Sequence, residues 1–156
     1  MNIATRLKQY LDASGISYEC IHHAPTTTTL AAAREARGAA KDVAKCVLLG
    51  DDRGYLLAIL PASHRLDLNE IERQLDRRLA LVDEEETKQV FADCALGAVP
   101  AMGKAYGVPT ILDHRLLDLI HLYFEAGNHE DLVHLSGLAF RALLADSEFG
   151  EISRAN

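Results

Sequence analysis

The sequence has no long hydrophobic run and few residues suited to cross-linking. No apolar stretch approaches the roughly 20 residues that a helix needs to cross a bilayer, and the first residues, "MNIATRLKQYLDAS", lack the apolar segment of a signal peptide. The three cysteines (Cys20, Cys46 and Cys94) are widely spaced and form no CxxC pair. We therefore expect a cytoplasmic protein with reduced thiols, and no membrane partner.

Several catalytic and metal-binding motifs are also missing. The chain has no HExxH and no GxSxG, which argues against a zinc hydrolase and a serine triad. The segment "GAVPAMGKA", residues 97–105, is not a P-loop, because five residues separate its glycines and Ala105 stands where a hydroxyl would hold magnesium. The adjacent His22 and His23 would point to opposite faces of a strand. We expect neither a metal nor a cofactor.

The bulk composition fits one folded domain. The chain has 156 residues, of which 49% are hydrophobic and 25% are charged. This length is enough for a single core, and there is no internal repeat or linker, so we expect one domain over residues 1–156 with a loose tail from 146 to 156. The net charge of −7 argues against a protein that coats nucleic acid over its whole surface, but it permits a local positive patch.

One short stretch is the starting point for function. "AKCVLLGDDRGYLLAIL", from Ala44 to Leu60, has two apolar runs joined by an Asp/Gly-rich link, which predicts a β-hairpin over about 43–49 and 55–60. Lys45 stands at the head of the first run, where an unpaired ammonium is costly to bury. Cys46, on the opposite face of the strand, is expected to be a buried, inert thiol.

The remaining elements alternate irregularly. Helical spacing begins near Ile3 and ends before Gly15, and Asp67 and Asp83 each precede a glutamate three residues later, which is a helix-start pattern. Further helices are expected over 30–38 and after Ser136, and strands at 16–22, 79–82, 110–113, 119–124 and 132–135. This order predicts an α+β fold: a mixed, largely antiparallel, barrel-like sheet of six or seven strands surrounded by helices.

Two further segments have both an ordinary and a functional interpretation. The glycine- and proline-rich stretch 94–109 is a structured loop, either a tight connection or a rigid support for a ligand, since Gly97 permits unusual dihedrals and Pro100 fixes its own φ. Arg34, Arg37 and Lys41 lie three and four residues apart. They form either a solvated helix face or, with Lys45, a strip that binds phosphates.

Taken together and in order, three features resemble one family. They are Lys45 at the head of the hairpin, "GAVPAMG" followed by "YGVPTILD", and "YFEAGNHEDLVHLS". This set resembles the YbaK / prolyl-tRNA-synthetase-associated domain family of single-domain aminoacyl-tRNA deacylases, over about residues 4–144. The resemblance implies a barrel-like mixed sheet wrapped by helices, and removal of wrongly attached amino acids from tRNA, either in trans or within a synthetase.

The resemblance also implies site residues. Lys45 matches the family's functional lysine, and Gly97 to Pro100 match its substrate loop, although many members have three residues between glycine and proline where this chain has two, Ala98 and Val99. His129 in "GNHE" is the candidate for a histidine that some members use. The catalytic candidates are therefore Lys45, Gly97 and His129. The substrate-binding candidates are His22, Thr28, Ser63, Ala98, Val99, Pro100, Gly127 and Asn128, and the tRNA-binding candidates are Arg34, Arg37 and Lys41.

The expected chemistry needs no covalent nucleophile, because an aminoacyl ester is already activated. Lys45 would hold the terminal phosphate or the ester carbonyl, while the 97–100 loop orients the ester and a water. The pocket would lie between the hairpin, Thr26–Thr29 and this loop. The expected partners are the 3′ end of an aminoacylated tRNA and an aminoacyl-tRNA synthetase, with no DNA. Two alternatives stay open: a non-catalytic tRNA- or synthetase-binding module of the same fold, and a small-molecule hydrolase.

Overall fold

The computed structural model describes residues 3–24 and 42–156. The predicted helix at 30–38 and the Thr26–Thr29 segment lie outside these residues. The predicted hairpin is present as β2 (Ala44–Asp51) and β3 (Gly54–Pro61), and its antiparallel register pairs Lys45 with Leu60. At the turn, Nε and one terminal nitrogen of the Arg77 side chain donate to Asp51, at 2.9 and 2.7 Å, which ties the tip of the hairpin to the segment after helix α3 (Leu68–Leu75).

The hairpin is the centre of a five-stranded mixed sheet with the order β5-β2-β3-β6-β9. β5 pairs antiparallel with β2, whereas β6 pairs parallel with β3 and β9 parallel with β6. β3 is buried from Leu56 to Pro61, so both of its faces are covered. The other strands of this sheet are β5 (Ala80–Leu81), β6 (Thr110–Asp113) and β9 (Glu148–Gly150).

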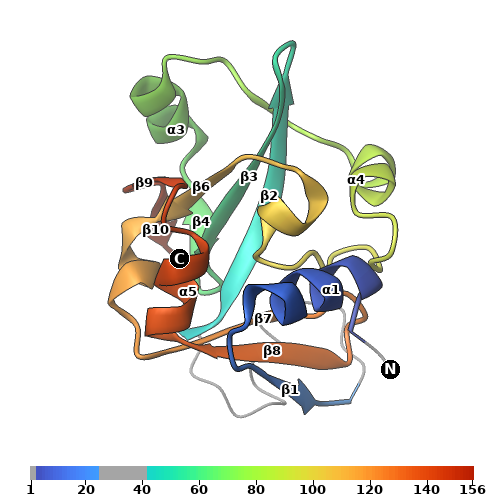
Figure 1. The fold of residues 1–156 in the computed structure, drawn as a ribbon. Helices are drawn as coiled ribbons and strands as arrows, with labels where there is room; N and C mark the ends of the chain where they lie inside the picture. Colours follow the sequence, from blue (N-terminus) through green and yellow to red (C-terminus); the bar gives the residue numbers. More distant parts are fainter. Residues whose placement is uncertain (1–2, 25–41) are drawn as a thin grey trace.

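A second, antiparallel sheet has the order β1-β8-β7 and lies across the base of the hairpin (Figure 1). An isolated parallel bridge between Val43 and Tyr123 joins the start of β2 to β7. In Figure 1, helices α1 (Thr5–Ser14) and α5 (Gly137–Leu143) cover the face of this sheet that is turned toward the hairpin. The strands are β1 (Glu19–His22), β7 (His121–Glu125) and β8 (Asp131–Ser136).

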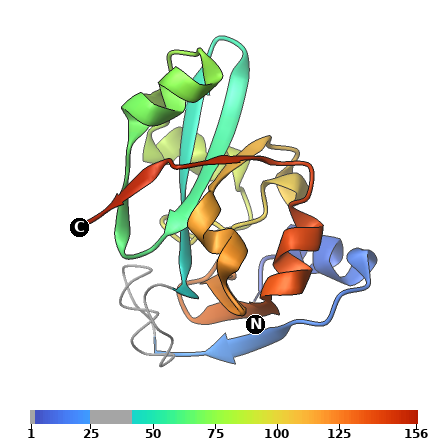
Figure 2. The same cartoon turned by 90° about the vertical axis from the view of Figure 1, so that its left-hand side faces the viewer.

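The C-terminal residues form strands and are not the loose tail expected from the sequence. β9 pairs with β6, and β10 (Ser153–Ala155) pairs antiparallel with β4 (His64–Leu66), which forms a third, two-stranded sheet. Figure 2 shows the C-terminal segment (red) crossing the molecule to reach β4 (green). Ile152 and Ser153 are buried there. Ile152 belongs to a hydrophobic cluster that includes Ile71, and the Ser153 hydroxyl donates to the side chain of Asp113, the last residue of β6.

Side-chain caps start three of the helices, as the sequence predicted. The amide of Glu70 donates to Asp67 at 3.3 Å and that of Glu86 to Asp83 at 2.8 Å, while Ser136 accepts from the third residue of the last helix at 3.1 Å. Gly15 ends the first helix with φ of 74°. The helices are α1 (Thr5–Ser14), α3 (Leu68–Leu75), α4 (Glu84–Val90) and α5 (Gly137–Leu143), with 3₁₀ turns η2 (Gly103–Tyr106) and η3 (His114–Asp118).

Alternating side chains of the hairpin separate two hydrophobic clusters. Leu57 and Ile59 face the main cluster, together with Leu7 of α1 and Phe140 of α5. Leu56, Ala58 and Leu49 face a second cluster that Ile71 of α3 and Ile152 complete. This period-2 partition explains why β3 is apolar at nearly every position.

The α+β class with mixed, largely antiparallel strands is confirmed, with two corrections to the detail. The described residues contain ten strands instead of six or seven, and they form three sheets that do not close into a barrel. The additional strands β4, β9 and β10 have three residues each. Strands this short have too few residues to show an alternating pattern.

Candidate active site

Lys45 is the second residue of β2, and the β2–β3 ladder fixes its backbone. Its neighbours Ala44 and Cys46 face the main hydrophobic cluster, so alternation turns the lysine to the other side of the strand. The side chain is half-buried, and this desolvation lowers the pKa of its ammonium. Within the described ranges no carboxylate pairs with it. The strand thus presents a partly desolvated positive charge that is suited to a ligand.

Strand β7 carries a buried carboxylate, Glu125, and burial together with the charge of Glu125 raises the pKa of the Cys46 thiol on β2. Glu125 is 1% exposed. Glu125 is not among the residues predicted from the sequence, where the available signal was one acidic residue inside the apolar run "HLYFEA".

His129 connects this carboxylate to the predicted glycine loop. Its Nδ1 lies 4.0 Å from Glu125 Oε2, and its Nε2 hydrogen-bonds to the carbonyl oxygen of Leu96. Because a carbonyl only accepts, Nε2 carries a proton in this hydrogen bond. The backbone of His129 is left-handed, with φ of 62°, which turns the ring toward the loop.

The structure thereby brings together the predicted residues Gly97 and His129. Gly97 has φ of 77°, and a Cβ placed on it would lie 3.4 Å from His129 Cε1. The neighbouring contact is also tight: Ala95 donates its amide to the Gly127 carbonyl at 2.7 Å, and a Cβ on Gly127 would lie 2.8 Å from that of Ala4. Two loops whose contacting residues are up to 33 positions apart in sequence thus pack against each other.

The rest of the predicted substrate loop faces inward. Ala98 is fully buried, Pro100 is buried, and Val99 packs partly against the main cluster. These side chains hold the loop in place, while Gly97 and the half-exposed Leu96 form its outer surface. The exposed surface of the loop at Gly97 is therefore formed by backbone atoms.

Other predicted residues have local partners or lie outside the described part. The side-chain oxygen of Asn128 accepts from two amides of its own turn at 2.9 Å, so it shapes the loop that carries His129. His22 is exposed at the end of β1, with Nδ1 3.3 Å from Asp131 Oδ1. Ser63 lies in the turn between β3 and β4. The predictions for Thr28, Arg34, Arg37 and Lys41 fall on residues that the structure does not describe.

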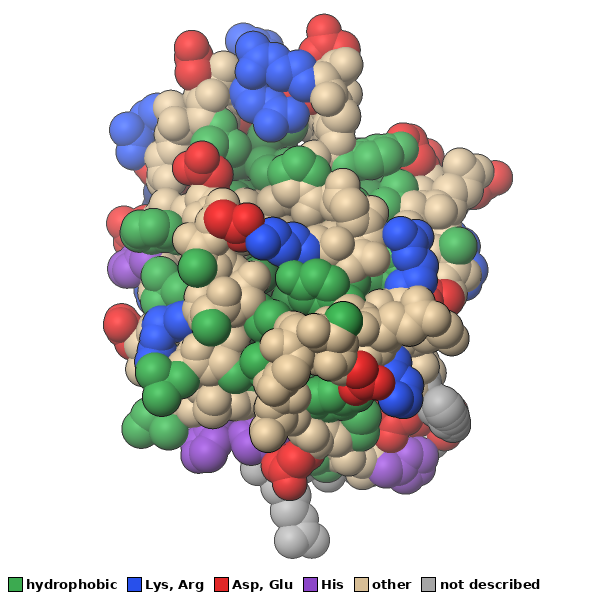
Figure 3. Space-filling view, in the orientation of Figure 1, with side chains coloured by type: hydrophobic (Ala, Val, Ile, Leu, Met, Phe, Trp, Pro, Cys, Tyr) green, Lys and Arg blue, Asp and Glu red, His purple; other side chains and the backbone are tan. Residues whose placement is uncertain are grey.

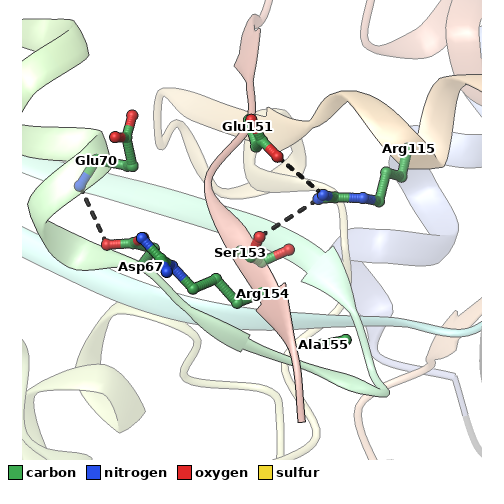
Figure 4. Close-up of a pocket in the computed structure, with 7 residues that line it drawn as sticks. All are labelled: Asp67, Glu70, Arg115, Glu151, Ser153, Arg154 and Ala155. Carbon is green, nitrogen blue, oxygen red and sulfur yellow. Dashed lines mark hydrogen bonds and ion pairs between the residues drawn. The ribbon is translucent and has the colours of Figure 1, made fainter.

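The predicted acyl pocket includes Thr26–Thr29 as one wall, so it stays a prediction. Beside Gly97 the described residues leave a hollow of about 10 Å³, lined by the end of α4, residues 94–97 and Val99. A larger hollow of about 400 Å³ lies elsewhere, between β10, η3 and the start of α3 (Figure 4). It is lined by Asp67, Glu70, Arg115, Glu151, Ser153, Arg154 and Ala155.

A row of imidazoles lies on the sheet face away from α1 and α5. His121 Nδ1 lies 2.9 Å from His134 Nε2, and His134 Nδ1 lies 2.7 Å from a carboxylate oxygen of Glu19. Tyr123 stacks on His134 with the ring centroids 4.7 Å apart. Figure 3 shows histidine side chains at this lower edge of the molecule. No group of three His, Cys, Asp or Glu side chains in residues 3–24 and 42–156 is arranged to hold a metal ion.

Comparisons with known proteins concern the sequence and the fold as a whole. The family model for the aminoacyl-tRNA editing domain matches residues 23–143. Among curated proteins, no sequence matches the chain.

No helix in the described part is long and apolar enough to cross a membrane.

Two solved structures share the fold over nearly their whole length. The crystal structure of a candidate trans-editing enzyme for prolyl-tRNA synthetase is 21% identical, covers 97% of each chain and superposes with a TM-score of 0.85. A crystal structure of a hypothetical protein is 18% identical, covers 96% of this chain and 99% of its own, and gives a TM-score of 0.84. At these identities the likeness concerns the fold, whereas the family model matches the sequence itself over most of its length. The chain belongs to the aminoacyl-tRNA editing domain family.

Proposed function

We propose that the protein is a trans-acting aminoacyl-tRNA deacylase, which hydrolyses the ester between a wrongly attached small amino acid and the terminal ribose of a tRNA. The observation that carries the proposal is the family match over 23–143, which contains Lys45, Gly97 and His129. The neighbour described as a candidate trans-editing enzyme for prolyl-tRNA synthetase favours tRNA(Pro) as the tRNA and that synthetase as a partner.

The residues of this chain suit such a reaction. A water oxygen bonds to the ester carbonyl carbon, the ribose oxygen leaves with a proton, and the products are the free amino acid and tRNA. The Lys45 ammonium, held by the sheet and partly desolvated, stabilises the oxyanion or holds the terminal phosphate. The backbone at Gly97, braced by His129, orients the ester.

A separate editing pocket has a physical reason. One methylene changes binding in a synthetase pocket by only about 1–3 kcal/mol, so amino acids smaller than the correct one are attached at an appreciable rate. A second pocket that admits only the smaller product removes them. The candidates are alanine, serine, threonine, cysteine and 2-aminobutyrate.

The test is a panel of mischarged tRNAs, beginning with alanyl-tRNA(Pro), with release of the amino acid as the readout. Lys45→Ala should lower the rate by about 100-fold or more, since it removes a charge aimed at the developing oxyanion. Lys8→Ala is the matched control, because Lys8 is an exposed helix residue paired with Asp12. Full activity of Lys45→Ala would remove Lys45 from the mechanism, and a wild-type protein that binds tRNA without hydrolysis would favour the binding-module alternative.

The proposed tRNA-binding strip has its own test. Arg34→Glu and Arg37→Glu should weaken tRNA binding, most visibly at low salt, because each removes a positive charge that would displace counterions from phosphates. Gel shifts at two salt concentrations measure this. Equal affinity of wild type and both variants would assign these arginines to a solvated surface.

A further inference from the structure

A hydrogen-bonded row of three side chains lies where β4 and β10 meet, on residues that the proposed function has not used. The Oγ of Ser153 donates to Asp113 Oδ2 at 2.6 Å, and His64 Nδ1 lies 2.9 Å from the same Oγ. Asp113 is fully buried and Ser153 is 2% exposed. Arg115 braces the row from the side, with a guanidinium nitrogen 3.1 Å from Asp113 Oδ2 and 3.3 Å from the Ser153 carbonyl (Figure 4).

This row fixes the tautomer of His64. Burial opposes ionisation of Asp113, but hydrogen bonds from Ser153 and Arg115 hold the pKa of its carboxyl below the ordinary value, so Asp113 only accepts. Ser153 has one hydroxyl proton, and it goes to Asp113. Toward His64 the Oγ can then only accept, so Nδ1 carries the proton and Nε2 of the neutral ring has a free lone pair. That nitrogen makes no hydrogen bond to a described residue.

The chain path places His64 beside the start of β2. The antiparallel register that pairs Lys45 with Leu60 continues as a hydrogen bond from the Ala62 amide to the Val43 carbonyl at 2.7 Å, and His64 follows two residues later. The groups that act on its charge come from three elements. Burial and the charges of Arg115 and Lys45 lower the pKa of His64, while Asp113 opposes them. The imidazole is therefore neutral at pH 7, and Lys45 is among the charges that act on it.

We propose that His64 is the general base for the water that attacks the ester at Lys45, with Asp113 and Ser153 as its positioning residues. The inference rests on the proposed deacylation. Nε2 takes a proton from the water as its oxygen bonds to the carbonyl carbon, and Lys45 stabilises the oxyanion. When the tetrahedral intermediate breaks down, the imidazolium returns that proton to the leaving ribose oxygen. The histidine ends neutral, and one water is consumed for each ester.

The experiment compares His64→Ala with His114→Ala, a matched control on the exposed histidine of η3. General-base catalysis contributes about 10²–10⁴-fold, so His64→Ala should lower kcat by at least about 100-fold, while His114→Ala retains it. In the wild type, kcat/KM should fall toward acid with a midpoint below 6.5, as His64 becomes protonated. That acid limb should disappear in His64→Ala.

The outcomes separate the two hypotheses. A wild type that hydrolyses none of the mischarged tRNAs refutes the proposed function. An active wild type whose His64→Ala variant keeps more than a third of its kcat and the same pH profile overturns the role of His64 alone. Nitrogen-15 NMR of the wild-type imidazoles tests the structural premise independently of variant folding. It should show His64 protonated at Nδ1 and should show this preference lost in Ser153→Ala, and an Nε2-protonated His64 would contradict the inference.

Discussion

Substitutions at Gly97 can separate backbone strain from the contact with His129. Gly97 and Gly107 have nearly the same left-handed backbone, with φ of 77° and 69°, but their surroundings differ. A Cβ at Gly107 has nothing within 4 Å, whereas one at Gly97 touches the His129 ring at 3.4 Å. Alanine fits at both positions and adds only the left-handed penalty of about 1–2 kcal/mol. Valine extends further, into open space at Gly107 and into His129 at Gly97.

We therefore expect Gly97→Ala and Gly107→Ala to lose equal stability, about 1–2 kcal/mol in urea unfolding, and both to keep most of their deacylase activity. Gly97→Val should displace His129 and lower kcat/KM by about 100-fold, as a misplacement of about 1 Å does, while Gly107→Val remains active. The assay is amino acid release from alanyl-tRNA(Pro). If both valine variants have the same activity, the His129 contact has no part in the reaction and Gly97 serves only the turn.

Two further predictions concern stability. Arg77 hydrogen-bonds to Asp51 and lowers the pKa of that carboxyl from 3.8 to about 2, so the pair stabilises the fold fully above pH 3.8 and loses this effect as the pH falls toward 2. Arg77→Ala should melt below wild type at pH 7, with a gap that closes by pH 2; a gap of constant size would contradict the linkage. Gly127→Ala should cost more than Gly97→Ala, because its Cβ would lie only 2.8 Å from that of Ala4 at a φ of 109°. Equal urea midpoints for Gly127→Ala and Gly97→Ala would contradict this, because they would show that α1 moves away from the added methyl group at little cost in stability.

The local elements could be predicted from the sequence, because their signals lie within a few residues. Asp67 and Asp83 each cap a helix through an amide three residues away, and the Asp/Gly turn closes a hairpin whose strands follow directly. By contrast, β4, β9 and β10 are stabilised by distant partners; Arg154 reaches Asp67 across 87 residues. A three-residue strand has no periodicity of its own, so its existence depends on the partner.

The candidate site divides in the same way. Lys45 was recognised because an unpaired ammonium at the head of an apolar strand is unfavourable to bury. The glycine and proline of the 97–100 loop indicated a backbone of fixed conformation. Glu125 was missed because its burial arises from tertiary packing, and His64 because its tautomer depends on Ser153 and Asp113, far along the chain.

The sequence by itself therefore determined the hairpin, the helix starts, the family resemblance and the lysine, since these depend on residue type and short spacing. Only the tertiary structure decided which groups surround that lysine. The charges that act on His64, the position of its ring proton and the contact between Gly97 and His129 all depend on residues that are distant in the chain. Only packing of the folded chain brings such residues within a few ångströms of each other.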